Sequence, residues 1–147
     1  TTGTIEVRNA LANNGVTRVG YMKFDLSKID KEIESVKLCI YGAAKSNETK
    51  VSKVEMNVYS IIEDNWTEKT LTESNKPFTE EVIGKMMFDE AMKEISLDVT
   101  RFVKAQKNRD NFVSFAFKAD TPEGYVNFRS RESTNVSQRP CLKITFK

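Results

Sequence analysis

The closing stretch of the chain, from Tyr125 to Phe146, reads YVNFRSRESTNVSQRPCLKITF and decides the fold. Apolar and polar side chains alternate from Tyr125 to Arg131, and they alternate again from Leu142 to Phe146. A period of two is typical of half-buried strands. The polar run from Ser133 to Gln138 predicts the turn between them, so the stretch is predicted to form a β-hairpin.

The two faces of this predicted hairpin differ in chemistry. One face would be buried and carries Val126, Phe128, Leu142, Ile144 and Phe146. The other would face solvent, and its charges are all positive: Arg129, Arg131, Lys143 and Lys147. If the two strands are neighbours, the outward charges form a basic patch.

The same alternation recurs through the chain, in residues 4–9, 18–26, 36–41, 54–59, 95–99 and 111–118. Residues 100–108 have apolar side chains at helical spacing, with Asp98 or Thr100 available as a cap. Residues 78–90 fit either a helical turn or a connection. We therefore expect about eight strands and one short helix. This pattern predicts an all-β fold, a two-sheet antiparallel β-sandwich of jelly-roll type, as a single domain over residues 1–147.

The charge composition narrows the classes of partner. The chain has 23 basic and 21 acidic residues, a net charge of +2, so a basic site must arise from how the charges are placed. The pI of about 8.5 is modest, and no nucleic-acid recognition motif is present, so we expect no nucleic-acid partner. No apolar run is long enough to span a bilayer, and we expect no membrane partner.

The sequence offers few residues that are typical of an enzyme active site. The chain has no histidine, which excludes Ser-His and Cys-His nucleophile pairs and the commonest zinc ligand. The acidic residues cluster in predicted loops, and they do not suggest two carboxyl groups facing each other across a cleft. We expect a protein that is not an enzyme and needs no cofactor. A structural calcium held by loop oxygens stays open, but no motif indicates a metal site.

The two cysteines, Cys39 and Cys141, are too far apart in sequence for a Cys-x-x-Cys motif. Both have outward parity on predicted strands. A disulfide would require those strands to be neighbours, and two free thiols are the alternative.

An ordered set of motifs along the chain resembles the DNRLRE domain family, whose carbohydrate-binding members form carbohydrate-binding module family 96. The motifs are YMKFDLS from Tyr21, IESVKLCIY from Ile33, VY at Val58, DNWTEKTLT from Asp64, LDVT from Leu97, FV at Phe102, FRSRE from Phe128 and RPCL from Arg139.

The resemblance implies a β-sandwich appendage of a secreted bacterial polysaccharide-degrading enzyme. Such modules are associated with alginate, an acidic polyuronate. The sequence departs from the family pattern twice. The family usually has an additional opening strand before the position of Thr4, and here either the chain is trimmed or that edge strand is missing. A second tryptophan, common in the family near the position of Glu73, is absent. We therefore expect a module that binds an acidic polysaccharide, acts in the extracellular space and is linked covalently to a catalytic domain, a polysaccharide lyase.

Outward parity on strands selects the candidate ligand-binding residues. The basic ones are Arg8, Lys23, Arg129, Arg131 and Lys143, and Tyr21 stands beside Lys23. Arginine binds carboxylates through a bidentate fork and lysine as a point charge, which suits a polyuronate. Tyr41, Tyr59 and Tyr125 also have outward or strand-end parity, whereas Trp66 resembles a loop anchor.

Three alternatives stay open. Each charged residue can simply solvate a sheet face, with Arg131 and Glu132 as a structural ion pair. The domain can instead be a structural or adhesive part of a bacterial surface protein, in which case an exposed apolar patch is expected. A polysaccharide lyase in its own right would require turnover by this chain alone.

Overall fold

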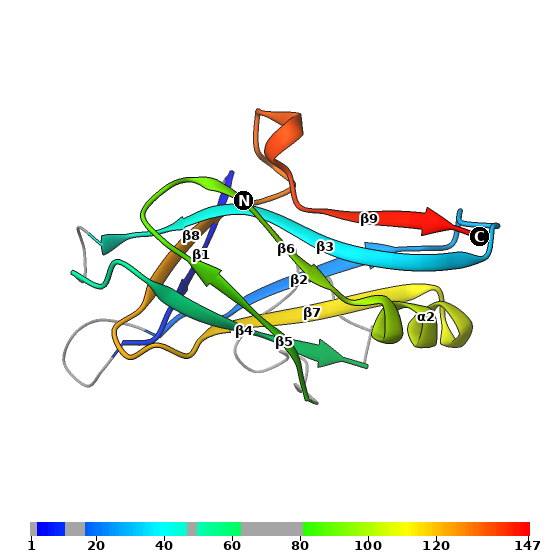
Figure 1. Cartoon of the computed structure of the whole chain (residues 1–147), viewed down its shortest axis with the longest axis horizontal. Coiled ribbons are helices and arrows are strands. Elements are labelled where there is room, and N and C mark those ends of the chain that lie inside the picture. Colours follow the sequence, from blue (N-terminus) through cyan, green and yellow to red (C-terminus); the bar gives the residue numbers. More distant parts are fainter. Residues whose placement is uncertain (1–2, 11–16, 47–49, 63–80) are drawn as a thin grey trace.

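The computed structural model describes residues 3–10, 17–46, 50–62 and 81–147, and these form two antiparallel sheets packed face to face (Figure 1). The first sheet contains β1 (Thr4–Arg8), β8 (Tyr125–Arg129), β3 (Ile33–Ala44) and β6 (Lys93–Asp98) in that order, with β9 (Cys141–Phe146) also paired to β3. The second contains β2 (Gly20–Asp25), β7 (Phe112–Ala119), β4 (Val54–Ile61) and β5 (Val82–Phe88). The helix α2 (Thr100–Arg109) follows β6, and the short 3-10 helix η1 (Val136–Gln138) precedes β9.

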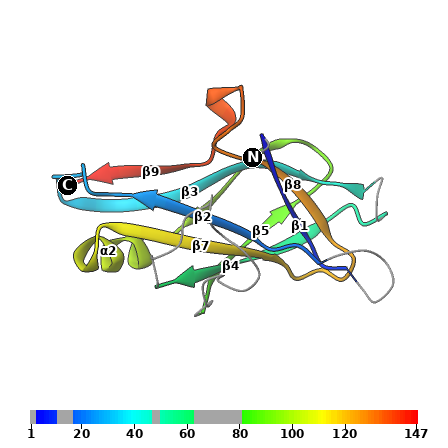
Figure 2. The same cartoon turned by 180° about the vertical axis from the view of Figure 1, so that it is seen from behind.

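The connections between strands give this sandwich its jelly-roll topology. The chain passes from one sheet to the other between most consecutive strands, so that the order β1-β8-β3-β6 faces the order β2-β7-β4-β5. Figure 2 shows the sandwich from behind. This is the strand order of a jelly roll. The predicted fold class is therefore confirmed. None of the described helices has the length and apolar character needed to cross a bilayer.

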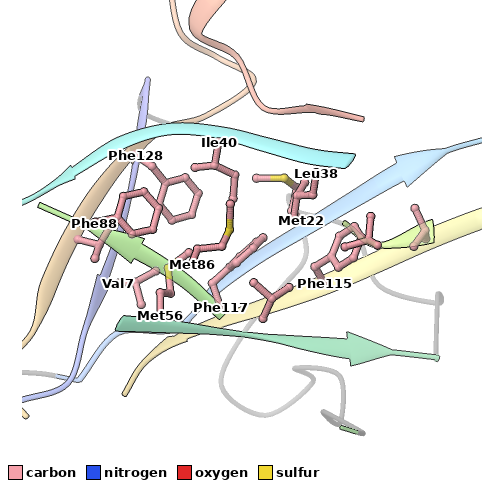
Figure 3. Close-up of a cluster of buried hydrophobic side chains, with 14 of the residues drawn as sticks. Val7, Met22, Leu38, Ile40, Met56, Met86, Phe88, Phe115, Phe117 and Phe128 are labelled. Carbon is pink, nitrogen blue, oxygen red and sulfur yellow. The ribbon is translucent and has the colours of Figure 1, made fainter. Parts of the chain in front are cut away.

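The core lies between the two sheets and is built from the inward residues of the alternating pattern (Figure 3). Phe117 of β7 and Phe128 of β8 meet across the core at a ring-centroid distance of 5.5 Å in an edge-to-face arrangement. Both side chains are fully buried. Such a pair adds specific geometry to the burial of apolar area. The strands that carry the outward residues are thereby held in fixed register.

The predicted helix is present, but its N-cap residue is Val99, which makes no side-chain cap hydrogen bond, and not Asp98 or Thr100 as expected. The side chain of Asp98 accepts hydrogen bonds from the Thr100 amide at 2.9 Å and from the Thr100 hydroxyl at 2.6 Å. The Thr100 hydroxyl oxygen also accepts a hydrogen bond from the Val36 amide at 2.9 Å. Thr100 therefore connects the start of α2 to β3.

The predicted closing hairpin is wrong. β8 pairs with residues 42–44 of β3, and β9 pairs with residues 33–39 of the same strand. Because β6 occupies the other side of β3, β8 and β9 follow one another along the same side and do not pair with each other. Side-chain alternation reveals which face a residue occupies, but it does not reveal which strand is the partner.

The ends of these two strands also differ from the prediction. β8 ends at Arg129, because Ser130 begins a turn. The Glu132 amide donates a hydrogen bond to the Ser130 hydroxyl oxygen, and the Ser133 amide donates one to the Ser130 carbonyl oxygen. Arg131 is therefore in a turn and not on a strand. Phe146 was expected inside but is 41% exposed, although it lies opposite the buried Ile33, because it is the last residue of β9 at the end of the sheet.

Residues 82–88 form the strand β5 where a helical turn or a connection was expected. Met86 and Phe88 are buried, whereas Met87 is 55% exposed. Inward and outward side chains do alternate in β5. Because methionine occurs on both faces of the strand, the sequence shows no alternation between apolar and polar residues. With β5 included, the described residues contain nine strands.

Candidate functional site

The two sheets approach each other along one side of the sandwich, where β1 is the edge of one sheet and β2 the edge of the other. Just before β2, the backbone of Arg18 forms an isolated bridge to Arg8 at the end of β1. Two hollows lie along this β1–β2 edge, and Val19 lines both. We name them the edge cleft and the basic hollow.

The edge cleft has a volume of about 480 Å³, within the range of small-molecule sites. Its lining residues are Thr4, Ile5, Val19, Gly20, Tyr21, Met22, Lys23, Phe24, Asp25, Ser130, Arg131, Glu132 and Pro140. It thus brings together three of the predicted ligand-binding residues, two from β2 and one from the turn after β8.

The charges of the edge cleft are balanced. The Lys23 ammonium lies 4.8 Å from the centroid of the Phe112 ring, and Arg131 pairs with Glu132 at 3.6 Å. A hydrogen bond from the Ser27 side chain, together with one from the Ser27 amide, lowers the pKa of the Asp25 carboxyl, so that Asp25 is anionic at neutral pH. Apolar side chains, among them Ile5 and Phe24, complete the lining. The cleft therefore suits a ligand with both apolar and polar faces.

The basic hollow has a volume of about 230 Å³ and lies at the Arg8 end of the edge. Its lining residues are Arg8, Asn9, Thr17, Arg18, Val19, Asn57, Tyr59, Lys118, Ala119 and Asp120. Three of these are cationic and one is acidic, so the described lining carries a net positive charge. The cations come from β1, from the residues before β2 and from β7, which are distant in sequence.

An aromatic ring and an amide line this hollow beside the cations. The Lys118 ammonium lies 4.8 Å from the centroid of the Tyr59 ring, a cation–π contact. Asn57 is 8% exposed, and its Oδ1 atom is buried with no hydrogen-bond partner among the described residues. A buried acceptor of this kind is costly to leave unsatisfied, but the atom is closed off from the hollow, so Asn57 contributes packing to the lining.

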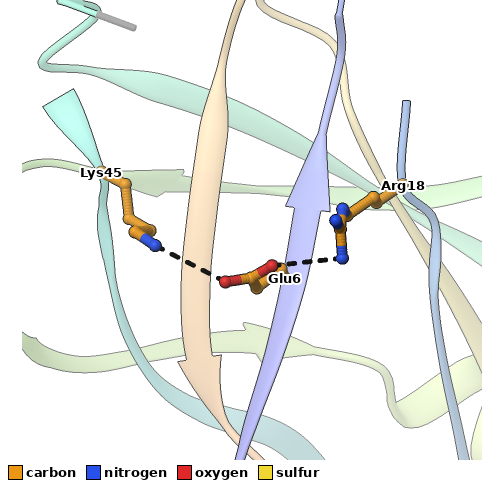
Figure 4. A network of polar contacts seen from close by, with 3 residues as sticks. All are labelled: Glu6, Arg18 and Lys45. Atoms are coloured by element: carbon orange, nitrogen blue, oxygen red, sulfur yellow. Dashed lines mark hydrogen bonds and ion pairs between the residues drawn. The ribbon is translucent and has the colours of Figure 1, made fainter. Parts of the chain in front are cut away.

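Glu6 organises the cations around the Arg8 end of the edge (Figure 4). Its carboxylate pairs with Arg18 at 3.3 Å and with Lys45 at 3.5 Å. A side-chain hydrogen bond from Tyr125 is the main cause that lowers the pKa of Glu6, and the two cations lower it further. The Tyr125 ring has cations near it as well, with Lys45 at 4.8 Å and Arg8 at 5.2 Å from the ring centroid. Tyr125 is thus a packing residue of this network.

A comparison with family profiles identifies the family of this chain. The profile of carbohydrate-binding module family 96 matches residues 1–146. The chain belongs to carbohydrate-binding module family 96. Among curated proteins, no sequence matches it at a significant level.

In this family 96 module, two predicted ligand-binding residues lie away from both hollows. Arg129 and Lys143 occupy the outer face of the first sheet, as Arg8 does. The Arg129 side chain donates to Gln138 at 3.1 Å, and the Lys143 ammonium donates to Glu94 at 2.7 Å. That hydrogen bond to Glu94 is the main cause that raises the pKa of Lys143. The predicted basic residues are therefore divided among the outer face, the basic hollow and the edge cleft.

The module has a further, larger cleft of about 800 Å³ between α2 and the ends of β5 and β6. Its rim residues Ile62 and Glu81 adjoin residues 63–80, which lie outside the described part of the chain. Trp66 and the position near Glu73 fall in that segment, so the predictions for them lie outside the described residues. Within the described ranges, no three His, Cys, Asp or Glu side chains are placed to hold a metal ion.

Sequence reasoning missed three residues of the basic hollow. Lys118 has outward parity in the predicted strand 111–118, and this signal was available. Arg18 has inward parity in the predicted strand 18–26, so alternation gave no sign of it. Asn57 lies on the outer face of β4, and only its burial beside Lys118 distinguishes it.

Proposed function

We propose that this module binds an acidic polysaccharide, alginate or a related polyuronate, along its β1–β2 edge. The observation that carries the proposal is the basic hollow, where Arg8, Arg18 and Lys118 line one small concavity with a single described acid, Asp120. A polyuronate presents a carboxylate on every sugar, and arginine and lysine are the side chains that bind carboxylates best.

The uncharged lining of the hollow fits the rest of a sugar ring. Tyr59 offers an aromatic face, on which the apolar face of a sugar can pack. A uronate has both an apolar ring face and a carboxylate and matches the ring and the cations together, whereas a neutral glycan offers the cations no carboxylate.

The edge cleft extends the site for a longer chain. Because Val19 lines both hollows, a polysaccharide held in the basic hollow can continue past Tyr21 and Lys23 toward Arg131. Residues 18–25 span roughly 20 Å at the rise of a β-strand, enough for several sugars. This assigns Arg8, Tyr21, Lys23 and Arg131 to ligand binding, and it leaves Arg129 and Lys143 as residues of an outer face.

The wider role follows from this binding. A non-catalytic module that holds an acidic polysaccharide raises the effective concentration of a covalently linked lyase at its substrate. A rigid sandwich suits this task, since charges held in place lose little entropy on binding. Such a protein acts outside the bacterial cell, where its polymer is found.

The test is calorimetric titration with alginate oligomers at low and high salt, beside neutral cellulose and xylan oligomers. We expect binding of alginate alone, weakened by salt because the contacts are charged. Arg18→Ala should reduce the affinity about tenfold, the value of one charge-assisted contact. Lys93→Ala is the matched control, because Lys93 pairs with Asp89 at 2.7 Å and lines neither hollow.

Failure to bind any acidic glycan, by a protein whose thermal unfolding is intact, contradicts the proposal. Equal losses in Arg18→Ala and Lys93→Ala would show that net charge matters and the basic hollow does not. The structural or adhesive alternative gains little support from the described residues, because their most exposed large apolar side chains lie at four places: just after β4, on β5, in η1 and at the end of β9.

A further inference from the structure

The two cysteines of the chain, which are far apart in sequence, are direct neighbours in the fold. The register of β3 and β9 places Cys39 opposite Cys141. They are the only cysteines among the 147 residues, and both are free thiols. We propose that Cys39 and Cys141 are a disulfide site, which under oxidising conditions joins β9 covalently to β3.

The backbone geometry favours the bond. Directly opposed residues in an antiparallel pair have Cα atoms roughly 4.5–5.5 Å apart, and disulfides span roughly 4.4–6.8 Å. Opposed side chains also project from the same face of a sheet. Here that face is the outer one, because Leu38 and Ile40, on either side of Cys39, are buried in the core. The two sulfur atoms can therefore meet without movement of the core.

The different exposure of the two thiols gives the reaction an order. Cys39 is 2% exposed, whereas Cys141 is half-buried. Burial raises the pKa of Cys39 to about 11, and the neighbouring Cys141 adds to this. Cys141 is therefore the thiol that an oxidant in solution reaches first, and Cys39 is the thiol that completes the bond.

The oxidant is a small-molecule disulfide, such as oxidised glutathione. The Cys141 thiol loses its proton to water, and its sulfur attacks the glutathione disulfide, which forms a mixed disulfide and releases one reduced glutathione. The Cys39 thiol then loses its proton, and its sulfur attacks the Cys141 sulfur and releases the second reduced glutathione. The two protein thiols are oxidised to one disulfide, and one glutathione disulfide is reduced to two thiols.

The disulfide would hold β9 in place, a strand that pairs along one side only in the described part of the chain. Among the described residues, β9 has β3 as its only strand partner. A bond between Cys39 and Cys141 closes a loop of about 100 residues, a length at which a cross-link restricts the unfolded chain strongly. It is independent of the proposed glycan site, because neither cysteine lines the edge cleft or the basic hollow.

The experiment compares the full chain after incubation with oxidised glutathione and after incubation with dithiothreitol. We expect a monomer whose mass is lower by two hydrogen atoms, no titratable thiol, and a peptide map that joins Cys39 to Cys141. The melting temperature should rise by about 10 °C. Cys141→Ala is the control, since this half-buried site tolerates alanine, and its melting temperature should not respond to either reagent.

Three outcomes would overturn the proposal. Two thiols that stay free in the folded, oxidised protein would show that the sulfur atoms do not reach each other. A disulfide-linked dimer, or glutathione that stays on Cys141, would show that the partner is intermolecular.

Discussion

Arg8 and Arg18 exchange two main-chain hydrogen bonds, each 3.0 Å long, and thereby join the edges of the two sheets at one point. Glu6 supports this junction from the side, through its ion pairs with Arg18 and Lys45. The position of the basic hollow is therefore set by backbone pairing, and the cations that line it come from a rigid frame.

The roles of Lys118 and Tyr59 in ligand binding should differ in how they depend on salt concentration. Lys118→Ala should weaken alginate binding about five- to tenfold at low salt, and the loss should shrink at high salt because screening already weakens charged contacts. Tyr59→Ala should weaken binding by a similar factor at both salt concentrations, since stacking is not screened. Titration calorimetry at two ionic strengths measures both effects.

Tyr59→Phe is the matched control, because it keeps the ring and removes only the hydroxyl. It should bind within about twofold of the wild type if the ring face makes the contact. A salt-independent loss in Lys118→Ala would argue against a carboxylate partner for Lys118.

Glu6 should make stability depend on pH in the acidic range. Its pKa in the folded protein lies below the ordinary value of 4.5, so its interactions are fully present above that value and are lost as pH falls through the folded pKa. Glu6→Gln should cost about 1 kcal/mol at pH 7. The gap between wild type and variant should close as the pH is lowered below about 4.5, which urea unfolding at several pH values measures.

Glu32→Gln provides a comparison for this effect. Glu32 pairs with Lys147 at 3.3 Å, but its side chain is 72% exposed. Its substitution should change stability little. A constant difference between wild type and Glu6→Gln from pH 7 to pH 3 would contradict the assigned role of the Glu6 carboxylate.

Even a methyl side chain at Gly42 should destabilise the fold. A Cβ atom at this position would lie 2.6 Å from the Phe128 Cβ and 2.9 Å from the Asn127 carbonyl oxygen, so β3 and β8 would have to separate. Gly42→Ala should lower the free energy of unfolding by about 1–3 kcal/mol, as overpacking does. Gly3→Ala should be nearly neutral, because the nearest atom to its Cβ would be 3.6 Å away. Equal midpoints for the two variants in denaturant titrations would refute this account.

Thr100 should contribute to the stability of the fold through its hydroxyl group and not through its methyl group. Thr100→Val keeps the shape of the side chain but leaves the Val36 amide without the acceptor that it has at 2.9 Å. We expect a loss of about 1–3 kcal/mol in the free energy of unfolding. Thr100→Ser retains the hydroxyl and should lose less than half as much. If serine and valine cost the same, the methyl group rather than the hydrogen bond joins α2 to β3.

Alternation made most of the fold predictable, because burial on one face of a sheet imposes a period of two on residues such as Met22 and Phe24 or Phe115 and Phe117. Where both faces carried apolar residues, as at Met86 and Met87, the signal was lost. Partner choice was not predictable. The pairing of β8 and β9 with β3 is set by the packing of the whole sandwich, which no local pattern records.

The candidate site was partly predictable for the same reason. Outward parity selected Tyr21 and Lys23, which do line the edge cleft. It could not separate Arg8, which lines the basic hollow, from Lys143, which pairs with Glu94 elsewhere on the sheet. A hollow shared by β1, β4 and β7 depends on long-range topology, so Lys118 became a candidate only in three dimensions.

The position of β3 also has a consequence for how the chain folds. β3 ends at Ala44, but the strands that pair with it, β6, β8 and β9, come from residues 93–146. During synthesis one edge of β3 therefore waits about 50 residues for β6, and its other edge waits about 80 residues for β8. Pairings between such distant segments make folding slow, since long loops must close before any contact stabilises them. The nascent chain is most vulnerable to aggregation in that interval, when β3 is a strand without neighbours.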